Sequence, residues 1–230
     1  MRIALLDDSE PIWFPKPDFA SDEGLLAVGG SLTRDRLLLA YSNGIFPWEL
    51  RGNPPLWHWY SPNPRFVLFP DEFKVSRSLK RAIDNAIFEV RVDTAFREVM
   101  EACAKVKRKN QPGTWIAPEM IDAYCTLHEE GLAHSFECYI GDELVGGLYG
   151  ISIGRSFFGE SMYHHQAEAS KVALASLVDF AKSQHFHFID CQSPTAHLQR
   201  LGARSIPRTS FLKMLAESLQ EGNAPGKWTL

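Results

Sequence analysis

The chain has 230 residues, of which 45% are hydrophobic and 23% charged, and its formal net charge is −4. This length suffices for one large domain or two small ones with a real core. No apolar run approaches the roughly 18 residues of a membrane-spanning helix, and the N-terminal stretch turns acidic too early for a signal peptide. The four cysteines show no Cys-x-x-Cys spacing, so we expect free thiols and a cytoplasmic protein. The acidic total disfavours binding to nucleic acid through bulk charge, but it leaves room for a local basic patch.

The first 65 or so residues are rich in Gly, Pro and aromatic residues. One helix is predicted there, over residues 33–42, with Thr33 as its N-cap and Asn43-Gly44 as its stop. The rest of the segment is expected to be irregular yet ordered, because it is too apolar to stay solvated. We therefore predict a small N-terminal domain over residues 1–64.

The remaining chain, residues 65–230, has the pattern of a mixed α+β domain. Alternation and turn residues predict strands at 65–69, 88–93, 134–140, 143–153, 156–162 and about 186–192. Helical spacing predicts helices at 74–86, 94–104, 118–130, 168–184, 194–201 and 208–219. The three strands between 134 and 162 should form an antiparallel meander, which gives a mixed, mostly antiparallel sheet flanked by helices.

Three polar side chains follow apolar strand residues. Asp190 and Gln192 are two residues apart in a strand, so we expect both on the same face, either capping the next turn or facing a ligand. Glu160 follows Phe157, Phe158 and Gly159 and is expected to enter a cleft, the alternative being a solvated edge-strand carboxylate. If the two strands are neighbours, the three side chains meet at one end of the sheet. Two acids and an amide without a nearby Ser or Cys nucleophile suit the orientation of a substrate amine better than covalent catalysis.

Four tryptophans lie in Pro- or Gly-rich contexts and are expected on loops: Trp48, Trp57, Trp59 and Trp115. Loop tryptophans offer flat surfaces on which bases stack, although packing between two domains explains each one equally well.

The helix at 74–86 has a basic side formed by Lys74, Arg77, Lys80 and Arg81, and an apolar side formed by Val75, Leu79 and Ile83. Further basic residues follow at Lys105, Lys107, Arg108 and Lys109. A solvated helix face is the ordinary explanation of such a side. Beside the tryptophans, it also fits phosphate contacts that position a nucleic acid without reading its sequence.

Metal and nucleotide-phosphate motifs are missing from the sequence. His164-His165 and His185-x-His187 have no Cys or carboxylate partners at zinc spacing, and neither glycine-rich phosphate-loop pattern occurs. We expect no metal.

Several blocks of the sequence, matched in the same order, resemble one family, the bacterial leucyl/phenylalanyl-tRNA–protein transferases. The blocks include GLLAVGGSLTRDRLLLAYSNGIFPW, SPNPR, TWIAPEMIDAYCTLHEEGLAHSFE, LVGGLYG, FFGESM, ASKVAL, IDCQ and HLQRLGA. The resemblance covers nearly the whole chain. It implies an enzyme that moves Leu or Phe, and Met less readily, from aminoacyl-tRNA to the N-terminal amine of proteins starting with Arg or Lys. The product would carry an N-terminus that marks it for proteolysis.

The resemblance also implies a fold and the roles of particular residues. The C-terminal domain would be similar to the GNAT acyltransferases, but HHQAEASK lacks the glycines of their coenzyme A loop, so no cofactor is expected. The protein is expected to be a monomer without membrane contact. The implied sites are catalytic Asp190, Gln192 and Glu160; an aminoacyl pocket of Leu148, Met162, Leu174 and Leu177; adenosine contacts at Trp48, Trp115 and Tyr124; and tRNA contacts at Arg77, Lys80 and Arg81.

Three other functions compete with this interpretation. They are a GNAT-type acetyltransferase, a non-catalytic RNA-binding module built on the tryptophans and the basic helix, and a metal-dependent hydrolase. The missing glycine loop disfavours the first and the ligand spacing disfavours the third. The second gives no reason for Glu160, Asp190 and Gln192 to converge.

Overall fold

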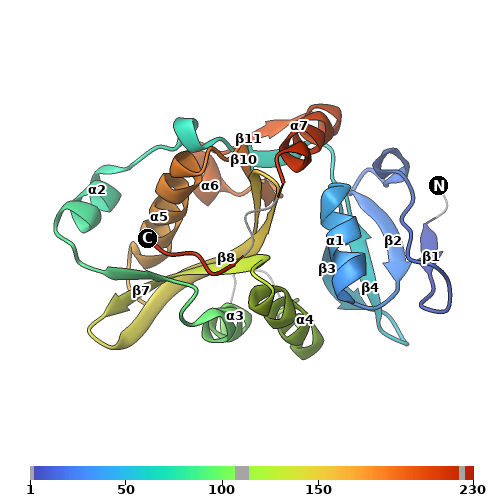
Figure 1. The fold of residues 1–230 in the computed structure, drawn as a ribbon, viewed down its shortest axis with the longest axis horizontal. Helices are drawn as coiled ribbons and strands as arrows, with labels where there is room; N and C mark the ends of the chain where they lie inside the picture. The colour runs from blue at the N-terminus through green and yellow to red at the C-terminus, as the bar shows by residue number, and fades with distance from the viewer. Residues whose placement is uncertain (1–2, 107–113, 223–225) are drawn as a thin grey trace.

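The computed structural model describes residues 3–106, 114–222 and 226–230. In these ranges the strands form a four-stranded sheet and a seven-stranded sheet (Figure 1). The smaller has the order β1–β2–β4–β3, with β1 at Ala4–Leu6, β2 at Leu25–Gly29, β3 at Phe46–Arg51 and β4 at Leu56–Tyr60. The larger has the order β11–β5–β10–β9–β8–β7–β6. Its strands are β5 (Arg65–Leu68), β6 (Glu89–Val92), β7 (Ala133–Ile140), β8 (Glu143–Ile153), β9 (Ser156–His164), β10 (Phe188–Gln192) and β11 (Arg204–Ile206).

Helices cover both faces of the larger sheet, and one helix packs against the smaller sheet. In Figure 1, α1 (Arg34–Ser42) lies against the smaller sheet, while α3 (Phe96–Lys105) and α4 (Pro118–Glu129) lie on one face of the larger sheet and α5 (Ala169–Ser183) on the other. The remaining helices are α2 (Arg77–Asp84), α6 (Ala196–Arg200), α7 (Arg208–Gln220) and the short 3-10 helices η1 (Pro17–Phe19) and η2 (Pro70–Glu72). The predicted α+β fold is confirmed: β9 and β10 pair in parallel, and the other neighbours in the large sheet pair antiparallel.

The expected irregular structure of the first 65 residues is wrong, because four strands form there. Pro47 is compatible with β3 because β3 is an edge strand, where a missing N–H breaks no ladder on its open side. Trp57 and Trp59 lie in β4 and are buried, and the Trp59 indole N–H donates to the Gly29 carbonyl at 2.8 Å. These two tryptophans are core residues and offer no surface to a base.

The helix N-cap predicted at Thr33 is confirmed, since its hydroxyl accepts from the Arg36 N–H. The apolar side predicted for α2 is only partly present. Leu79 is fully buried, but Val75 precedes the helix and is 50% exposed, and Ile83 is 44% exposed. The helix therefore buries one narrow strip.

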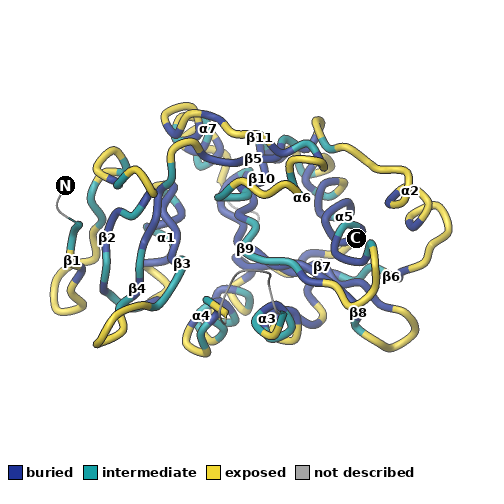
Figure 2. The backbone as a smooth tube through the Cα atoms, turned by 180° about the vertical axis from the view of Figure 1, so that it is seen from behind, coloured by how far each residue is buried: buried dark blue, intermediate teal, exposed yellow. Residues whose placement is uncertain are grey.

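Two apolar cores fill the molecule, one on each face of the large sheet. One joins the smaller sheet, α1, α3 and α4, and the other lies between the large sheet and α5. The strands β7 and β8 are buried along most of their length, and β9 and β10 are buried over their paired residues 156–158 and 188–190 (Figure 2). Tyr41 of α1 packs edge-on against Phe158 of β9, with 5.1 Å between ring centroids. The end of α1 therefore lies directly against the central strands of the large sheet.

The predicted domain boundary between residues 64 and 65 falls in the connection from β4 to β5. One apolar core contains residues from both sides of this boundary. The division into residues 1–64 and 65–230 therefore stays a proposal.

Candidate active site

A cavity of about 380 Å³ opens where β9 and β10 stop pairing. The two strands are bonded only along residues 156–158 and 188–190, and the cavity is lined by residues that follow on both strands. Its walls include side chains from the cores on both faces of the sheet, such as Trp115 from one and Leu177 from the other. The cavity is therefore lined by residues from both faces of the sheet.

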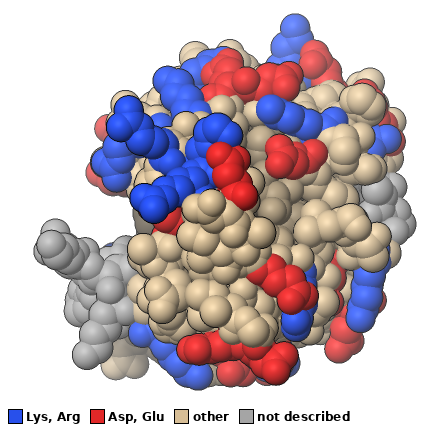
Figure 3. Space-filling view, turned by 90° about the vertical axis from the view of Figure 1, so that its left-hand side faces the viewer, with Lys and Arg blue, Asp and Glu red and all other residues tan. Residues whose placement is uncertain are grey.

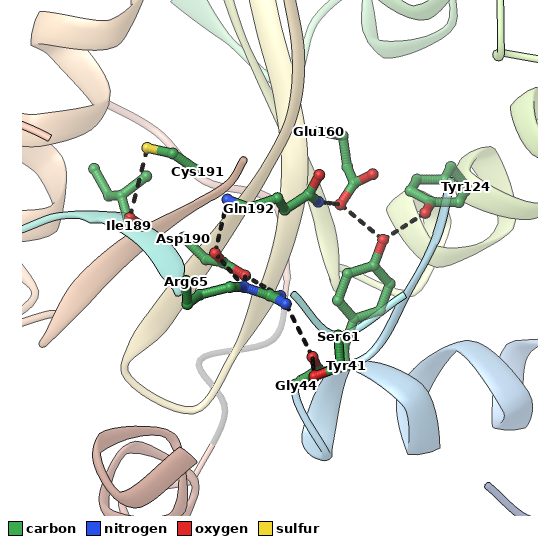
Figure 4. A network of polar contacts seen from close by, with 10 residues as sticks. All are labelled: Tyr41, Gly44, Ser61, Arg65, Tyr124, Glu160, Ile189, Asp190, Cys191 and Gln192. Carbon is green, nitrogen blue, oxygen red and sulfur yellow. Dashed lines mark hydrogen bonds and ion pairs between the residues drawn. The ribbon is translucent and has the colours of Figure 1, made fainter. Parts of the chain in front are cut away.

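Each strand carries an irregularity at its polar residue. The register of β10 against β5 shifts between Asp190 and Gln192, and Gln192 has φ of 60°. On β9, Ser161 pairs with Tyr149 and Gly159 pairs with Gly150, which leaves Glu160 as the extra residue of a bulge. Bulges redirect side chains, and here they bring the Gln192 Nε2 to 2.7 Å from the Glu160 Oε1, to which it donates (Figure 4).

The bulge also overturns the expectation that Asp190 and Gln192 share one face. Asp190 is completely buried, and its carboxylate is held by Arg65 of β5. The Arg65 Nη2 lies 2.6 Å from Oδ2, and Nε lies 2.9 Å from Oδ1. Asp190 Oδ1 also accepts the backbone N–H of Gln192 at 2.9 Å. Asp190 therefore lies behind the cavity wall and does not line the cavity. Of the three predicted side chains, those of Gln192 and Glu160 line it.

Two tyrosines support Glu160 from behind (Figure 4). The Tyr41 hydroxyl donates to Glu160 Oε1 at 2.7 Å, so the Tyr124 hydroxyl, 2.5 Å from that of Tyr41, must donate to it in turn. Burial raises the pKa of both tyrosines well above its usual range. Both therefore stay neutral, and Tyr124 is fully buried and does not line the cavity, so its expected contact with adenosine is not supported.

The apolar part of the cavity contains all four side chains expected for the aminoacyl pocket: Leu148, Met162, Leu174 and Leu177. Phe157, Ile189 and Leu198 extend this wall and were missed by the sequence reasoning. Apolar residues of strands and helices carry no signal that separates a cavity wall from a core.

Trp48 and Trp115 both line the cavity and are half-buried. Trp115 lies in the connection before α4, as expected, but Trp48 belongs to β3 and packs edge-on against Tyr60 with centroids 5.2 Å apart. The structure thus brings the two indoles to one cavity from sequence positions 67 residues apart.

Two further cavity residues carry chemistry that the sequence did not point to. Burial raises the pKa of the Cys191 thiol well above its usual range, so this thiol is a poor nucleophile. Burial lowers the pKa of His197, helped by the charges of Lys171 and Arg200.

The three residues expected to contact tRNA lie on α2, outside the cavity. Arg77 and Arg81 line a separate open hollow with Glu168, and Lys80 is paired with Asp84 at 2.9 Å. On the face that carries α2, Lys and Arg side chains gather with Asp and Glu side chains close beside them (Figure 3). Of the second basic stretch, Lys105 pairs with Glu101 at 3.9 Å, while Lys107, Arg108 and Lys109 lie outside the described residues.

The described residues contain no group of three or more His, Cys, Asp or Glu side chains that could hold a metal ion. Among the helices in the same ranges, none combines the length and the apolarity of a membrane span.

Comparison with known proteins gives consistent matches. The family model of the leucyl/phenylalanyl-tRNA protein transferases matches residues 67–216, and the model of the N-terminal domain of these proteins matches residues 30–63. A leucyl/phenylalanyl-tRNA–protein transferase from Myxococcus xanthus is 51% identical over 229 residues, which cover 100% of this chain and 97% of that protein. One from Legionella pneumophila strain Paris is 54% identical over 217 residues, covering 94% and 96%.

Solved structures match more weakly. L-PGS from Bacillus licheniformis is 13% identical with a TM-score of 0.39, covering 73% of this chain and 54% of that one. A GCN5-related N-acetyltransferase-like protein from Streptococcus suis is 14% identical with a TM-score of 0.36, covering 63% and 57%.

The ionisation of Glu160 gives a testable pH dependence of stability. Burial, with the charge of Asp190, raises the pKa of Glu160 from 4.5 to about 8. Between these values the folded protein holds a proton that the unfolded chain has released, so this carboxyl lowers stability as pH rises through that window. Glu160→Gln removes the titration. The free energy of unfolding of this variant minus that of the wild type should increase by on the order of 1–2 kcal/mol from pH 5 to pH 9, measured by urea unfolding.

Glu119→Gln, at an exposed position of α4, is the matched control and should show no such trend. A Glu160→Gln curve parallel to the wild type at all pH values would contradict a Glu160 that is protonated in the folded protein.

Proposed function

This chain belongs to the leucyl/phenylalanyl-tRNA protein transferase family, and we propose that it transfers Leu or Phe, and Met less readily, from aminoacyl-tRNA to the N-terminal α-amine of proteins starting with Arg or Lys. As a member of this family it is an aminoacyltransferase, whose substrates are an aminoacyl-tRNA and a protein. The extended protein would carry a destabilising N-terminus and be marked for proteolysis.

One observation supports this function above all: a single cavity combines an apolar half with a polar edge. Leu148, Met162, Leu174 and Leu177 line the apolar half, and the side chains of Glu160 and Gln192 form the edge. An amino acid esterified to a nucleotide has this division, because an apolar side chain projects beside an activated carbonyl.

The chemistry needs no covalent enzyme intermediate. The acceptor amine attacks the ester carbonyl carbon, the C–N bond forms, and the bond to the ribose oxygen breaks, so that a ribose hydroxyl leaves with a proton lost by the amine. The ester is already activated, and correct positioning alone can contribute about 7–11 kcal/mol. An α-amine has a reference pKa of about 7.7–8.0, so a useful fraction is neutral near pH 7.

We assign the orientation of that amine to Gln192. Because its Nε2 already donates to Glu160, its Oε1 is the atom left to accept a hydrogen bond from the attacking amine. Such a bond aims the nitrogen lone pair at the ester. Asp190 contributes by aligning Gln192 through the backbone N–H.

The cation of the acceptor's Arg or Lys side chain fits Glu160 better than Asp190. Asp190 is fully buried and neutralised by Arg65, whereas Glu160 lines the cavity. Glu160 attracts a cation once it is ionised, and a neighbouring positive charge in turn lowers its pKa.

The donor side of the proposal uses the indoles and the basic helix. Trp48 and Trp115 offer ring faces to the terminal adenosine, and Arg77, Lys80 and Arg81 offer phosphate contacts along the acceptor stem. Lys80 can serve this purpose only by leaving Asp84. Tyr124 would act indirectly, by fixing the Tyr41 hydroxyl.

The apolar half favours unbranched Cβ atoms on steric grounds. A narrow slot admits the CH₂ of Leu, Phe or Met and penalises Val and Ile, and since one methylene is worth only about 1–3 kcal/mol, selection is imperfect. We further propose that the protein acts as a monomer without a cofactor and in the cytoplasm, where charged tRNA is made.

A direct assay tests the function. The purified chain, with EDTA present, receives tRNA charged with labelled Leu or Phe and a short peptide acceptor. Label should join peptides that start with Arg or Lys, and it should not join the same peptides with an acetylated N-terminus, because acetylation removes the nucleophile.

Equal labelling of peptides that start with Ala would contradict the acceptor specificity. Consumption of acetyl-CoA with no use of charged tRNA would favour the acetyltransferase alternative, and binding of charged and uncharged tRNA without any transfer would favour the RNA-binding one.

The pocket assignment predicts a changed donor preference. Leu148→Ala or Met162→Ala widens the slot, so the ratio of kcat/KM for Phe-tRNA to that for Val-tRNA should fall about ten-fold, within the value of one methylene group. Ile140→Ala, at an exposed position of β7, is the control and should keep the ratio. The same Phe-to-Val ratio in both pocket variants as in the wild type would count against this pocket.

A further inference from the structure

Arg65 is the first residue of β5 and is completely buried, although it is one of the most polar side chains available. Its guanidinium donates three hydrogen bonds to the carboxylate of Asp190, at 2.6 to 3.1 Å. Its remaining arm, Nη1, donates to the Gly44 carbonyl at 3.0 Å. The guanidinium thus joins the turn after α1 to the strand that ends in Gln192.

The surroundings of the guanidinium fix its plane. It lies between the rings of Phe46 and Phe211, at 4.8 and 4.6 Å from their centroids. Gly44 has φ of 69°, and a Cβ there would lie within 3 Å of atoms of Leu212 and Phe211, so the carbonyl that receives Nη1 depends on a glycine. Rings from two elements and a carbonyl from a third leave the side chain a single arrangement.

What this arrangement controls is the backbone of Gln192. The Asp190 Oδ1 that Arg65 holds accepts the Gln192 N–H, at the residue where the ladder shifts register and φ turns positive. A positive φ is costly for a residue other than glycine, so it persists only where its surroundings impose it. The imposed turn directs the amide toward Glu160 and the cavity.

We propose that Arg65 is a positioning residue for aminoacyl transfer: through Asp190 it maintains the bulge that presents the Gln192 amide to the acceptor amine. This inference rests on the proposed function of Gln192. It adds to that function a residue that touches no substrate and assigns Asp190 the same positioning role.

The competing explanation is that the pair only stabilises the fold. The two can be separated, because exchanging both partners of a buried ion pair for apolar residues of similar volume commonly preserves stability, whereas removing one partner leaves an unpaired buried charge. An apolar pair cannot accept the Gln192 N–H.

The test compares Arg65→Met, Asp190→Leu and the double variant Arg65→Met/Asp190→Leu in the full-length chain. Each single variant should lower both Tm and kcat. The double variant should regain much of the lost Tm while its kcat for transfer from Phe-tRNA to an Arg-starting peptide stays about 100-fold below wild type, the usual cost of a misplaced group. KM for Phe-tRNA should not change, because the apolar half of the cavity and the indoles remain.

Arg36→Met is the matched control. Arg36 is also a buried arginine paired with an aspartate, Asp8, but Asp8 lies in the loop after β1, and neither residue lines the cavity. This variant should lower Tm and leave kcat unchanged, which separates lost stability from lost positioning.

The outcomes are distinguishable. A double variant that regains both Tm and kcat overturns the inference and leaves the pair a structural one. A wild-type chain that transfers no amino acid refutes the proposed function instead. If the double variant does not fold, Arg65→Lys decides: it keeps the charge but cannot reach Asp190 and Gly44 together, so an unchanged kcat in the folded protein overturns the inference.

Discussion

The buried pairing of Arg65 with Asp190 is the interaction on which the site depends. Burying two charges costs several kcal/mol per ion, and the attraction between them returns that cost only with near-ideal geometry and further hydrogen bonds. Both conditions are met here, because the two groups share three hydrogen bonds and the remaining polar atoms reach Gly44 and Gln192. An apolar pair would fill the same space at less electrostatic cost. An apolar pair could not accept the backbone N–H of Gln192. That hydrogen bond fixes the backbone conformation that points the Gln192 side chain toward Glu160.

Two supports therefore meet at Gln192, one at its backbone and one at its side chain. From one side Arg65 and Asp190 set the backbone of Gln192, and from the other Tyr41 and Glu160 hold its Nε2. Both supports begin at the end of α1, with Tyr41 in the helix and Gly44 in the turn that follows. The N-terminal part of the chain thus contributes directly to the arrangement of the polar edge, beyond supplying Trp48 to the cavity wall.

Much of this could be predicted from the sequence, and the limits have physical causes. The meander from β7 to β9 and the helix α5 follow local periodicity, so their bounds agree within about two residues of those expected. The expectation that Glu160 approaches Gln192 was correct because β9 and β10 are parallel neighbours, so residues that follow their paired segments lie close together. The burial of Asp190 was missed because its partner lies 125 residues away and because a one-residue bulge reverses the facing of everything after it. The strands β3 and β4 were missed because turn-forming residues surround them. Their alternating aromatic residues are typical of a strand, and Pro47 is compatible with β3 because β3 lies at the edge of the sheet.

We propose that the side-chain amide of Gln192 faces an aminoacyl ester in this cavity. A crystal structure of the chain with phenylalanyl-adenosine joined by a stable amide tests it most directly. We expect the phenyl ring among Leu148, Met162, Leu174 and Leu177, the adenine against an indole, and the Gln192 Oε1 facing the space beside the acyl carbonyl. An aminoacyl group bound outside this cavity, or a Gln192 side chain turned away from the carbonyl, would contradict it.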